Sequence, residues 1–341
     1  MNPIFLQALA RKNSAPRPPI WLMRQAGRYM ASYQKVRAKY NFLEMCKNPE
    51  LVFEVTKLPI DEFGFDAAIV FSDILLISEA MGLPLAFEEK RGPVIATPLR
   101  TQEDLKRLFS RPVVENLRFV IQAIKLLKKE LKVPLIGFAG APFTVASYMI
   151  EGCMADKKAH LLSKTKSWLY SDPKSFHSLL QVIEEYTVDF LNAQIDAGVD
   201  AIQLFDSWAN VLPSDQFEEC SASYTKRIFS RLKKCPRIIF CKGSSIFYES
   251  LQHVGAECIG LDLNRDLPSV RKKLGQDFAL QGNLDPEVLL AREDVMLSFA
   301  SKLLTSMKGD PGFIFNLGHG ILPTTPEKNV KALVDLVQSF S

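Results

Sequence analysis

Short apolar runs alternate with amphipathic segments along almost the whole chain of 341 residues, and this alternation is what most restricts its fold. Eight runs have the pattern of buried strands: 19–23, 67–71, 133–138, 201–205, 237–241, 258–261, 278–280 and 313–315. The segments between them have the pattern of helices: 50–62, 113–131, 176–197, 215–232, 246–254, 266–273 and 286–307. Continuous apolar runs suit strands buried on both faces, and helical crossovers make neighbouring strands parallel. The sequence therefore predicts an α/β protein with a parallel sheet.

Eight strands joined by helices predict a closed (β/α)8 TIM barrel. We expect a single domain comprising residues 1–341, because no linker or low-complexity tract divides the chain. One irregular stretch, residues 83–98, contains Pro84, Gly92, Pro93 and Pro98 around apolar residues. That mixture is typical of a small hairpin insertion, which we expect to cap the barrel.

The composition excludes several classes of protein. Hydrophobic residues make up 47% of the chain and charged residues 23%, which is ordinary for a globular protein and unlike a disordered one. No run approaches the ~20 apolar residues that a bilayer span needs, so no membrane association is expected. The apolar start is too short for a signal peptide, and the six cysteines include no CxxC pair. We therefore expect a cytoplasmic protein with reduced thiols.

Positive charge is concentrated at the front of the chain. The first 40 residues hold eight Lys and Arg and no acid, whereas the rest hold 34 bases against 38 acids. Such an asymmetry indicates either an anionic partner or a targeting role. An organelle transit sequence is one alternative, but only Ser14 and Ser32 occur in this segment, and strand-like sequence begins by Pro19.

Polar side chains follow the predicted strands, at the end where (β/α)8 barrels carry their active sites. In chain order they are Arg24, Arg28, Ser72, Asp73, Tyr148, Asp206, Ser207, Lys242, Asp262, Asn283, Asp285, Asn316 and His319. We expect these groups to converge on one mouth of the barrel.

Arg24 and Arg28 lie four residues apart after the first strand, with Gly27 beside the second. Each guanidinium can hold a carboxylate or a phosphate through two parallel hydrogen bonds. The alternative is a pair of solvated surface arginines, but no local acid is present to pair with them. Arg37 lies downstream and either joins this group or belongs to a helix surface.

Asp73 and His319 are the candidates for handling protons or developing charge. Asp73 follows an apolar strand and can act as a general base, a hydrogen-bond acceptor or a stabiliser of a cation. Its alternative role is to cap the helix that begins near Ile74, and Asp206 has the same ambiguity. His319 lies between two glycines, which allow a close approach of the backbone to a ligand.

Lys242 suggests a different class of enzyme. A lysine at the end of a barrel strand can form a Schiff base, as in an aldolase, and the following Gly243, Ser244 and Ser245 can bind phosphate through backbone amides. Cysteine and histidine spacings match no common zinc site, and no GxGxxG or GxxxxGK[ST] motif follows a strand. The motifs therefore predict neither a metal nor a nucleotide cofactor.

Several of these residues lie in longer motifs. They are PIWLMRQAGRY at 19–29, FSDIL at 71–75, GFAGAPFT at 137–144, SYMIEG at 147–152, QLFDSWA at 203–209, QGNLDP at 281–286 and FNLGHGI at 315–321. Together they closely resemble the signatures of the uroporphyrinogen decarboxylase family, in the same order and over nearly the whole chain.

The resemblance implies a (β/α)8 homodimer that removes carbon dioxide from the four acetate side chains of uroporphyrinogen without metal or organic cofactor. By motif position, Arg24, Arg28 and Arg37 would engage substrate carboxylates, and Asp73 would accept hydrogen bonds from pyrrole N–H groups. Tyr148, Ser207 and His319 would contact the substrate, and Phe138 and Phe205 would form apolar walls. Asp73, Arg24 and Tyr148 are the residues expected to be catalytic.

The sequence also departs from the family pattern, with Ala31 and Ser32, Asn210 and Leu263 replacing more frequent residues. These changes affect the entrance loops and not the proposed catalytic groups. Two alternatives remain open beside the aldolase: a zinc-dependent methyltransferase of the same superfamily, which the absence of any HxC motif disfavours, and a non-catalytic tetrapyrrole-binding protein. A substrate bearing eight carboxylates also accounts for the basic front segment better than nucleic acid does.

Overall fold

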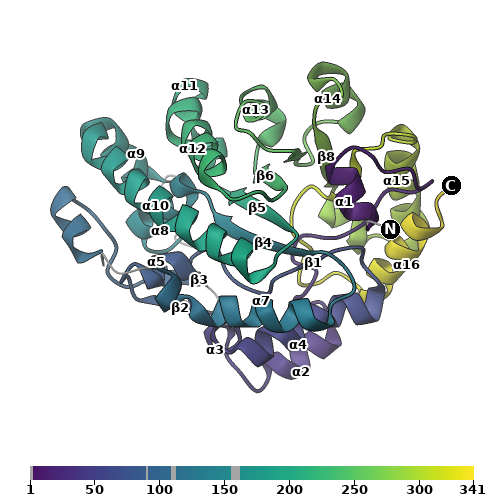
Figure 1. Ribbon diagram of the computed structural model, residues 1–341, viewed down its shortest axis with the longest axis horizontal. Helices are drawn as coiled ribbons and strands as arrows, with labels where there is room; N and C mark the ends of the chain where they lie inside the picture. Colours follow the sequence, from purple (N-terminus) through teal and green to yellow (C-terminus); the bar gives the residue numbers. More distant parts are fainter. Residues whose placement is uncertain (1–2, 90, 109–112, 155–161) are drawn as a thin grey trace.

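The computed structural model describes residues 3–89, 91–108, 113–154 and 162–341. Helices lie outside a strongly curved sheet, and the strands are followed by helices along most of the chain (Figure 1). The strands are β1 Ala68–Ile69, β2 Leu85–Glu88, β3 Gly92–Ile95, β4 Leu135–Gly140, β5 Ala201–Asp206, β6 Arg237–Cys241, β7 Cys258–Gly260, β8 Ala279–Leu284 and β9 Phe313–Leu317.

The α-helices are α1 Ile4–Leu9, α2 Ala31–Arg37, α3 Phe42–Lys47, α4 Pro49–Phe63, α5 Leu76–Ala80, α6 Val113–Asn116, α7 Arg118–Glu130, α8 Pro142–Glu151, α9 Ser163–Ser171, α10 Pro173–Ala197, α11 Ser214–Phe217, α12 Ser223–Arg231, α13 Ser244–Leu251, α14 Leu267–Leu274, α15 Glu293–Ser306 and α16 Glu327–Ser339. Shorter 3-10 turns are η1 Gln102–Arg107, η2 Ala209–Val211 and η4 Pro286–Leu290, and η3 Glu218–Ala222 is a π turn.

Seven parallel strands form the main sheet, in the order β1-β4-β5-β6-β7-β8-β9. The predicted first strand, residues 19–23, closes the ring: Ile20 forms a parallel bridge with Phe315 of β9. On its other side, the Asp66 N–H donates to the Ile20 carbonyl oxygen at 2.9 Å, just before β1. This segment makes few ladder bonds because Pro18 and Pro19 have no N–H. The predicted TIM-barrel fold is confirmed, with its first strand reduced to a bridge.

Side chains alternate between the inside and the outside of the barrel wall. On β5, Ala201 belongs to the inner apolar cluster, whereas Ile202 and Leu204 belong to the larger cluster under the helices. Helix α1 adds Phe5 and other apolar side chains to the inner cluster, beside the first residues of the strands. Both faces of the sheet are therefore buried, which explains why the strands read as continuous apolar runs.

A short polar chain crosses the inside of the barrel. The indole N–H of Trp21 donates to Oε1 of Gln281 at 2.8 Å, and Nε2 of Gln281 donates to Oε1 of Gln203 at 3.2 Å. All three side chains are buried. These bonds tie the bridge segment to β8 and β5 by side chains where its backbone ladder is short.

The predicted helices form, with some subdivision. Segment 113–131 consists of α6 and α7, segment 215–232 of α11, η3 and α12, and segment 286–307 of η4 and α15. Helix α8 was not predicted, because eight of its ten residues are buried and it shows no polar face. The short helices α1, α2, α3, α5 and α9 and the longer α16 were also not predicted.

The hairpin predicted within residues 83–98 is present. Strands β2 and β3 pair antiparallel, with Leu85 opposite Ile95 and Glu88 opposite Gly92. Val94 also forms an antiparallel bridge with Cys153, just after α8, so the hairpin is attached to the loop that follows the helix carrying Tyr148. In the described part of the chain, no helix combines the length and apolarity needed to cross a membrane.

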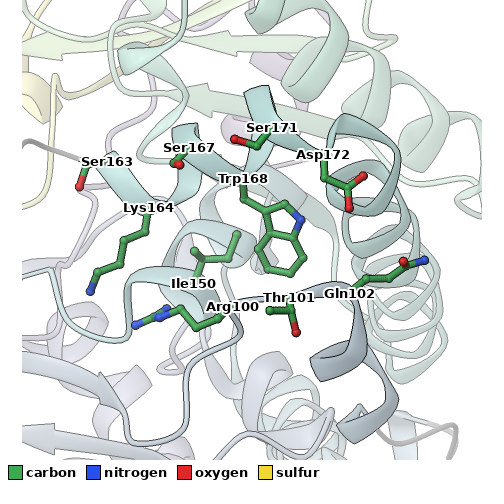
Figure 2. Close-up of a pocket in the computed structure, with 10 residues that line it drawn as sticks. All are labelled: Arg100, Thr101, Gln102, Ile150, Ser163, Lys164, Ser167, Trp168, Ser171 and Asp172. Atoms are coloured by element: carbon green, nitrogen blue, oxygen red, sulfur yellow. The ribbon is translucent and has the colours of Figure 1, made fainter.

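A pocket of about 610 Å³ opens between η1 and α9 (Figure 2). Trp168 and Ile150 form its apolar floor, and Arg100 and Lys164 lie at its rim. None of the site residues predicted from the sequence lines this pocket.

Candidate active site

The loop after the bridge segment holds Arg24 in a fixed and unusual backbone conformation. Arg24 has a φ of 63°, in the left-handed region that non-glycine residues rarely adopt. The neighbouring Met23 is held on both sides, because its N–H donates to Oδ1 of Asn316 at 3.1 Å and its carbonyl oxygen accepts from the Ile321 N–H at 2.9 Å. The conformation of Arg24 is therefore imposed by bonds to the segment that contains His319.

Gln25, which follows Arg24 in the chain, is also held in place by hydrogen bonds. Its side chain is buried, accepts from the Leu22 N–H at 3.2 Å and donates to the Ala67 carbonyl oxygen at 3.2 Å. The Gln25 carbonyl oxygen accepts from the Tyr29 hydroxyl at 2.6 Å. Sequence reasoning gave Gln25 no role; its position between two candidate arginines was the only signal.

Asp73 lies in the loop after β1, half-buried. Its Oδ1 accepts from the Leu75 N–H at 2.8 Å, so the capping role considered from the sequence occupies one oxygen. No described residue donates to Oδ2. Burial raises the pKa of Asp73 to about 6, against the opposing effects of the Leu75 N–H and the Arg24 charge. The carboxylate is therefore ionised at neutral pH and has one oxygen left for a ligand.

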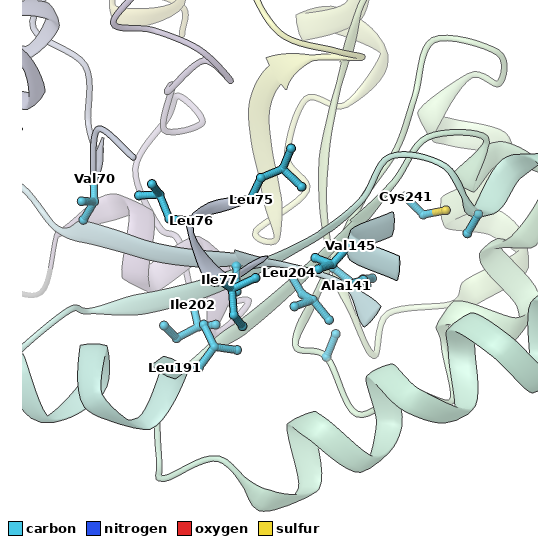
Figure 3. Close-up of a cluster of buried hydrophobic side chains, with 14 of the residues drawn as sticks. Val70, Leu75, Leu76, Ile77, Ala141, Val145, Leu191, Ile202, Leu204 and Cys241 are labelled. Carbon is cyan, nitrogen blue, oxygen red and sulfur yellow. The ribbon is translucent and has the colours of Figure 1, made fainter. Parts of the chain in front are cut away.

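An apolar cluster anchors the elements on both sides of Asp73 (Figure 3). Val70 precedes it on the β1 side, and Leu75, Leu76 and Ile77 follow it into α5. These side chains pack with others from β5, α8 and α10. The short loop that carries Asp73 therefore has little freedom to move.

His319 follows β9 and lies close to the charges of Arg24 and Lys242. Its Nδ1 accepts from the Gly320 N–H at 2.8 Å, which leaves Nε2 to carry the proton. Burial, together with the charges of Arg24 and Lys242, lowers the pKa of His319 to about 4. At neutral pH the imidazole is therefore neutral and offers an N–H.

Tyr148 and Trp208 form another side of the site. Their rings lie 6.2 Å apart, edge to face. Burial raises the pKa of Tyr148, and the Asp73 charge raises it further, so the phenol stays protonated. Lys242 is exposed and holds its ammonium 5.7 Å from the centre of the Trp208 ring.

Aromatic rings connect the proposed walls to His319. Phe138 contacts Phe205 at 5.6 Å between ring centres, Phe205 contacts Phe240 at 6.0 Å, and Phe240 contacts the His319 ring at 6.3 Å. Phe138 and Phe205 are only partly buried. Phe240 was not singled out from the sequence, because inside an apolar strand it looks like core.

Arg28 and Arg37 lie on the same side, around Tyr33. Both charges act to lower the pKa of Tyr33, which burial nevertheless raises to about 12. Arg28 is exposed, and no described carboxylate pairs with it. Arg37 is half-buried and donates from Nη1 to the Tyr40 carbonyl oxygen at 2.8 Å, so part of its guanidinium is already bonded. Ser207 is half-buried beside Trp208.

Other polar residues at the strand ends connect loops. Asp206 is buried and accepts from the hydroxyls of Thr144 at 2.5 Å and Ser221 at 2.6 Å. Asp262 accepts from the Gly243 N–H at 2.7 Å, and Asn283 donates to the Asp262 carbonyl oxygen at 2.6 Å. These groups connect adjacent loops of the mouth.

Further residues at the strand ends serve the same structural purpose. Asp285 accepts from the Glu287 N–H at 2.9 Å and so caps η4. Asn316 holds the Met23 N–H, as described above. The structure thus brings Arg24, Asp73, Tyr148, Lys242 and His319 together, and it uses Asp206, Asp262, Asn283, Asp285 and Asn316 to support the loops.

Among the residues that the structure describes, no three His, Cys, Asp or Glu side chains lie close enough to hold a metal ion. Cys241 is buried at the end of β6, where burial raises its pKa well above the ordinary range of a thiol. His319 already accepts a backbone N–H through Nδ1. The donor sets that common metal sites use are therefore not assembled around this mouth.

Comparisons with known proteins agree on one family. The family model described as uroporphyrinogen decarboxylase (URO-D) matches residues 2–340. A uroporphyrinogen decarboxylase of Protochlamydia amoebophila is 49% identical over 338 residues, covering 99% of this chain and 92% of the relative. A uroporphyrinogen decarboxylase of Carboxydothermus hydrogenoformans is 45% identical over 345 residues, covering 100% and 97%.

A solved structure, a methyltransferase from Methanosarcina mazei, superposes with a TM-score of 0.82 over 98% of this chain and 97% of that chain. Its sequence identity is 20%, so this likeness shows the shared fold alone. The identity to the full-length relatives is far higher and extends over the whole barrel. The chain belongs to the uroporphyrinogen decarboxylase family.

Proposed function

We propose that this chain converts the four acetate side chains of uroporphyrinogen III into methyl groups and so forms coproporphyrinogen III, with Asp73, Arg24 and Tyr148 as its catalytic residues. One observation carries the assignment of the site. The Asp73 carboxylate lies at the barrel mouth with one oxygen bonded to Leu75, and the charge of Arg24 acts on Asp73, Tyr148 and His319 alike.

The reaction needs an electron sink. Loss of carbon dioxide from an acetate on a pyrrole leaves an unstabilised carbanion unless a ring carbon is first protonated. Once the ring is protonated, the bond to the carboxylate breaks and its electron pair flows into the ring. The exocyclic carbon then takes up a proton, the ring loses one, and each acetate consumes one proton overall. The substrate supplies the sink that a cofactor supplies in other decarboxylases.

Asp73 suits the part of cation stabiliser. Its ionised oxygen accepts hydrogen bonds from the pyrrole N–H groups and offsets the positive charge that develops on the ring. Stabilisation of this kind in a dry site contributes about 3–4 kcal/mol to lowering the barrier. The pKa of about 6 keeps the group ionised at neutral pH, and burial strengthens its interaction with a cation.

The remaining residues bind and shape the substrate. Arg24 and Arg28 anchor its carboxylates through paired N–H groups, with Arg37 adding charge at longer range. His319 donates from Nε2, and Tyr148 donates from its protonated hydroxyl. Phe138 and Phe205 form the apolar walls and Ser207 adds a polar contact. Arg24 also has the position for passing a proton with the help of the substrate's own carboxylates.

The broader organisation is part of the same proposal. The chain acts in the cytoplasm as a homodimer of single-domain barrels. It uses no metal or organic cofactor and binds no nucleic acid. Support comes from the near-complete coverage of the chain by the family model.

The test is a decarboxylation assay on the purified protein with uroporphyrinogen kept reduced, in buffer containing a metal chelator and no added cofactor. We expect stepwise loss of four carboxyl groups, with coproporphyrinogen as the end product. Chromatography monitors this loss. Asp73→Asn should fold normally and lose at least about 100-fold in kcat. Retention of most of its kcat by that variant would remove Asp73 from the mechanism, and failure of the unmodified protein to release carbon dioxide would overturn the function.

A further inference from the structure

We propose that Gly320 is a positioning residue: its missing side chain leaves the space in which the Arg24 side chain is held over the site. This inference rests on the proposed function only for its catalytic consequence. Its structural part concerns two residues of the chain alone. Gly320 lies directly after His319 and is buried.

Contact distances show what a side chain at this position would meet. A Cβ at Gly320 would lie 2.4 Å from Cδ of Arg24, 2.7 Å from Cγ and 3.0 Å from Nε. The first two distances are far below those that carbon atoms tolerate. They involve the middle of the arginine side chain, so a small adjustment of its far end does not relieve them.

The backbone of Gly320 does not itself require glycine. Gly282, within the neighbouring strand β8, has a φ of 137°, whereas Gly320 is not among the glycines with positive φ. An alanine can therefore adopt the local conformation without strain. What excludes a larger residue is the volume taken up by Arg24.

Arg24 cannot move its backbone to make room. The carbonyl oxygen and N–H of Met23 are bonded to Ile321 and Asn316, and the buried Gln25 follows directly. The strained φ of 63° shows that these bonds already hold the residue away from its preferred conformation. A methyl group at Gly320 would therefore force the Arg24 side chain into another rotamer, with its guanidinium displaced from Asp73 and His319.

Displacement of that charge has a signature separate from catalysis. The Arg24 charge lowers the pKa of both Asp73 and His319. Gly320→Ala leaves the N–H that bonds Nδ1 of His319 in place, because it changes only the side chain. Both pKa values should therefore rise in this variant, and for His319 the change is visible by NMR titration of the imidazole.

The experiment is a double-mutant cycle of wild type, Gly320→Ala, Arg24→Ala and the double variant, with the unfolding midpoint and the His319 titration measured without substrate. We expect Gly320→Ala to lower the midpoint by about 2–6 °C in the wild-type background, because overpacking is costly. With Arg24 truncated to alanine, the added methyl has room, and the same change should leave the midpoint within about 1 °C.

Gly318→Ala is the matched control in the same loop. Its Cβ would meet the backbone nitrogen of Leu263 at 2.6 Å, and Arg24 is not among its nearest contacts. Its effect on the midpoint should therefore be equal in both backgrounds. If Gly320→Ala alone fails to fold while the double variant folds, the inference is supported; if both fail, it is overturned.

Two further results would overturn the inference: an additive cycle for Gly320→Ala and Arg24→Ala, or an unchanged His319 titration in Gly320→Ala. On the catalytic side, we expect Gly320→Ala to lose about 10-fold or more in kcat/KM. If the wild-type chain releases no carbon dioxide but the cycle is non-additive, the proposed function fails and the positioning role stands. If it decarboxylates normally but the cycle is additive, the proposed function stands and the positioning role of Gly320 fails.

Discussion

Gly320 donates its backbone N–H to Nδ1 of His319 at 2.8 Å, and this bond determines which ring nitrogen of His319 carries the proton. A nitrogen that accepts a hydrogen bond is unprotonated, so the proton of the neutral ring sits on Nε2. The pKa of about 4 keeps the ring neutral at any ordinary working pH. We therefore expect His319 to act as a hydrogen-bond donor to the substrate and not as a source of protons.

Substitutions of His319 should separate these two roles. Glutamine places an N–H near the position of Nε2, whereas asparagine places one near Nδ1. We expect His319→Gln to keep kcat within about 3-fold and to raise KM modestly, and His319→Asn to raise KM by about 10-fold. Steady-state kinetics at pH 7 check this. An equal loss of kcat in both variants would point to proton transfer by His319.

The pH dependence of the reaction should follow Asp73. Its carboxylate must be ionised to stabilise a cationic ring, and its pKa is raised to about 6. We therefore expect kcat/KM to fall as the pH drops through about 6, with a slope of one proton. Asp73→Asn should show low activity and no such limb. A limb centred near pH 4 in the wild-type enzyme would contradict a buried, raised carboxyl.

The pH dependence of folding stability should run opposite to that of activity, as far as Asp73 is concerned. The folded-state pKa of Asp73 lies above its unfolded value, so the folded protein binds this proton more tightly. The corresponding stability is fully present below the unfolded pKa and is lost as the pH rises through about 6. Asp73→Asn should therefore be more stable than wild type at pH 7, by about 1–3 kcal/mol in urea unfolding, and should lose this advantage below pH 4. Equal stability at both pH values would show that the carboxyl is well solvated.

The basic front segment should divide into a structural part and a substrate-binding part. Arg17 pairs with Asp66 through two bonds of 2.7 and 2.9 Å, and Oδ2 of Asp66 also accepts from the Ile20 N–H at 2.8 Å. We expect Arg17→Gln to lower the free energy of unfolding by about 1–3 kcal/mol with little change in KM. Arg28→Gln should leave stability unchanged, raise KM about 3- to 10-fold and weaken the dependence of KM on salt. Exchange of these two outcomes would reverse the assignment.

Substitutions of Lys242 should distinguish a substrate-binding role from formation of a Schiff base. Its exposed ammonium lies over the Trp208 ring, and no described carboxylate pairs with it. We expect Lys242→Met to raise KM a few-fold with kcat retained, and Lys242→Arg to restore most of the affinity because only the charge is needed. Borohydride should trap no substrate on the protein. An inactive Lys242→Arg together with covalent trapping would support the aldolase alternative.

The sequence predicted the barrel well because its strands and long helices have distinct periods. It missed α8, which is buried on almost all sides and so lacks a polar face. It also predicted a longer first strand than the single bridge that forms, because Pro18 and Pro19 remove ladder donors. Short helices such as α3 had local capping signals, including the box formed by Asn41 and Glu44, but too few residues for a periodic pattern.

The site was harder to predict, because position after a strand does not separate binding groups from structural ones. Asp73 and Asp206 look alike in the sequence, yet one keeps an oxygen without a described donor and the other is taken up by Thr144 and Ser221. The difference depends on hydroxyls that are 62 and 15 residues away from Asp206. Long-range partners of this kind leave no local pattern. The roles proposed for Gln25 and Gly320 are equally hidden, since they depend on residues far away in the chain: Gln25 bonds Ala67, and Gly320 lies against Arg24.

The barrel wall has few backbone hydrogen bonds beside the candidate active site. The bridge at Ile20 and the two-residue strand β1 are neighbours in the ring, and they lead directly to Arg24 and Asp73. This seam has the fewest backbone bonds to resist opening, and it is held instead by side chains such as Gln25 and Asp66. A ligand that contacts both Arg24 and Asp73 would connect the two sides of this seam, so its binding energy would also stabilise the barrel against opening there.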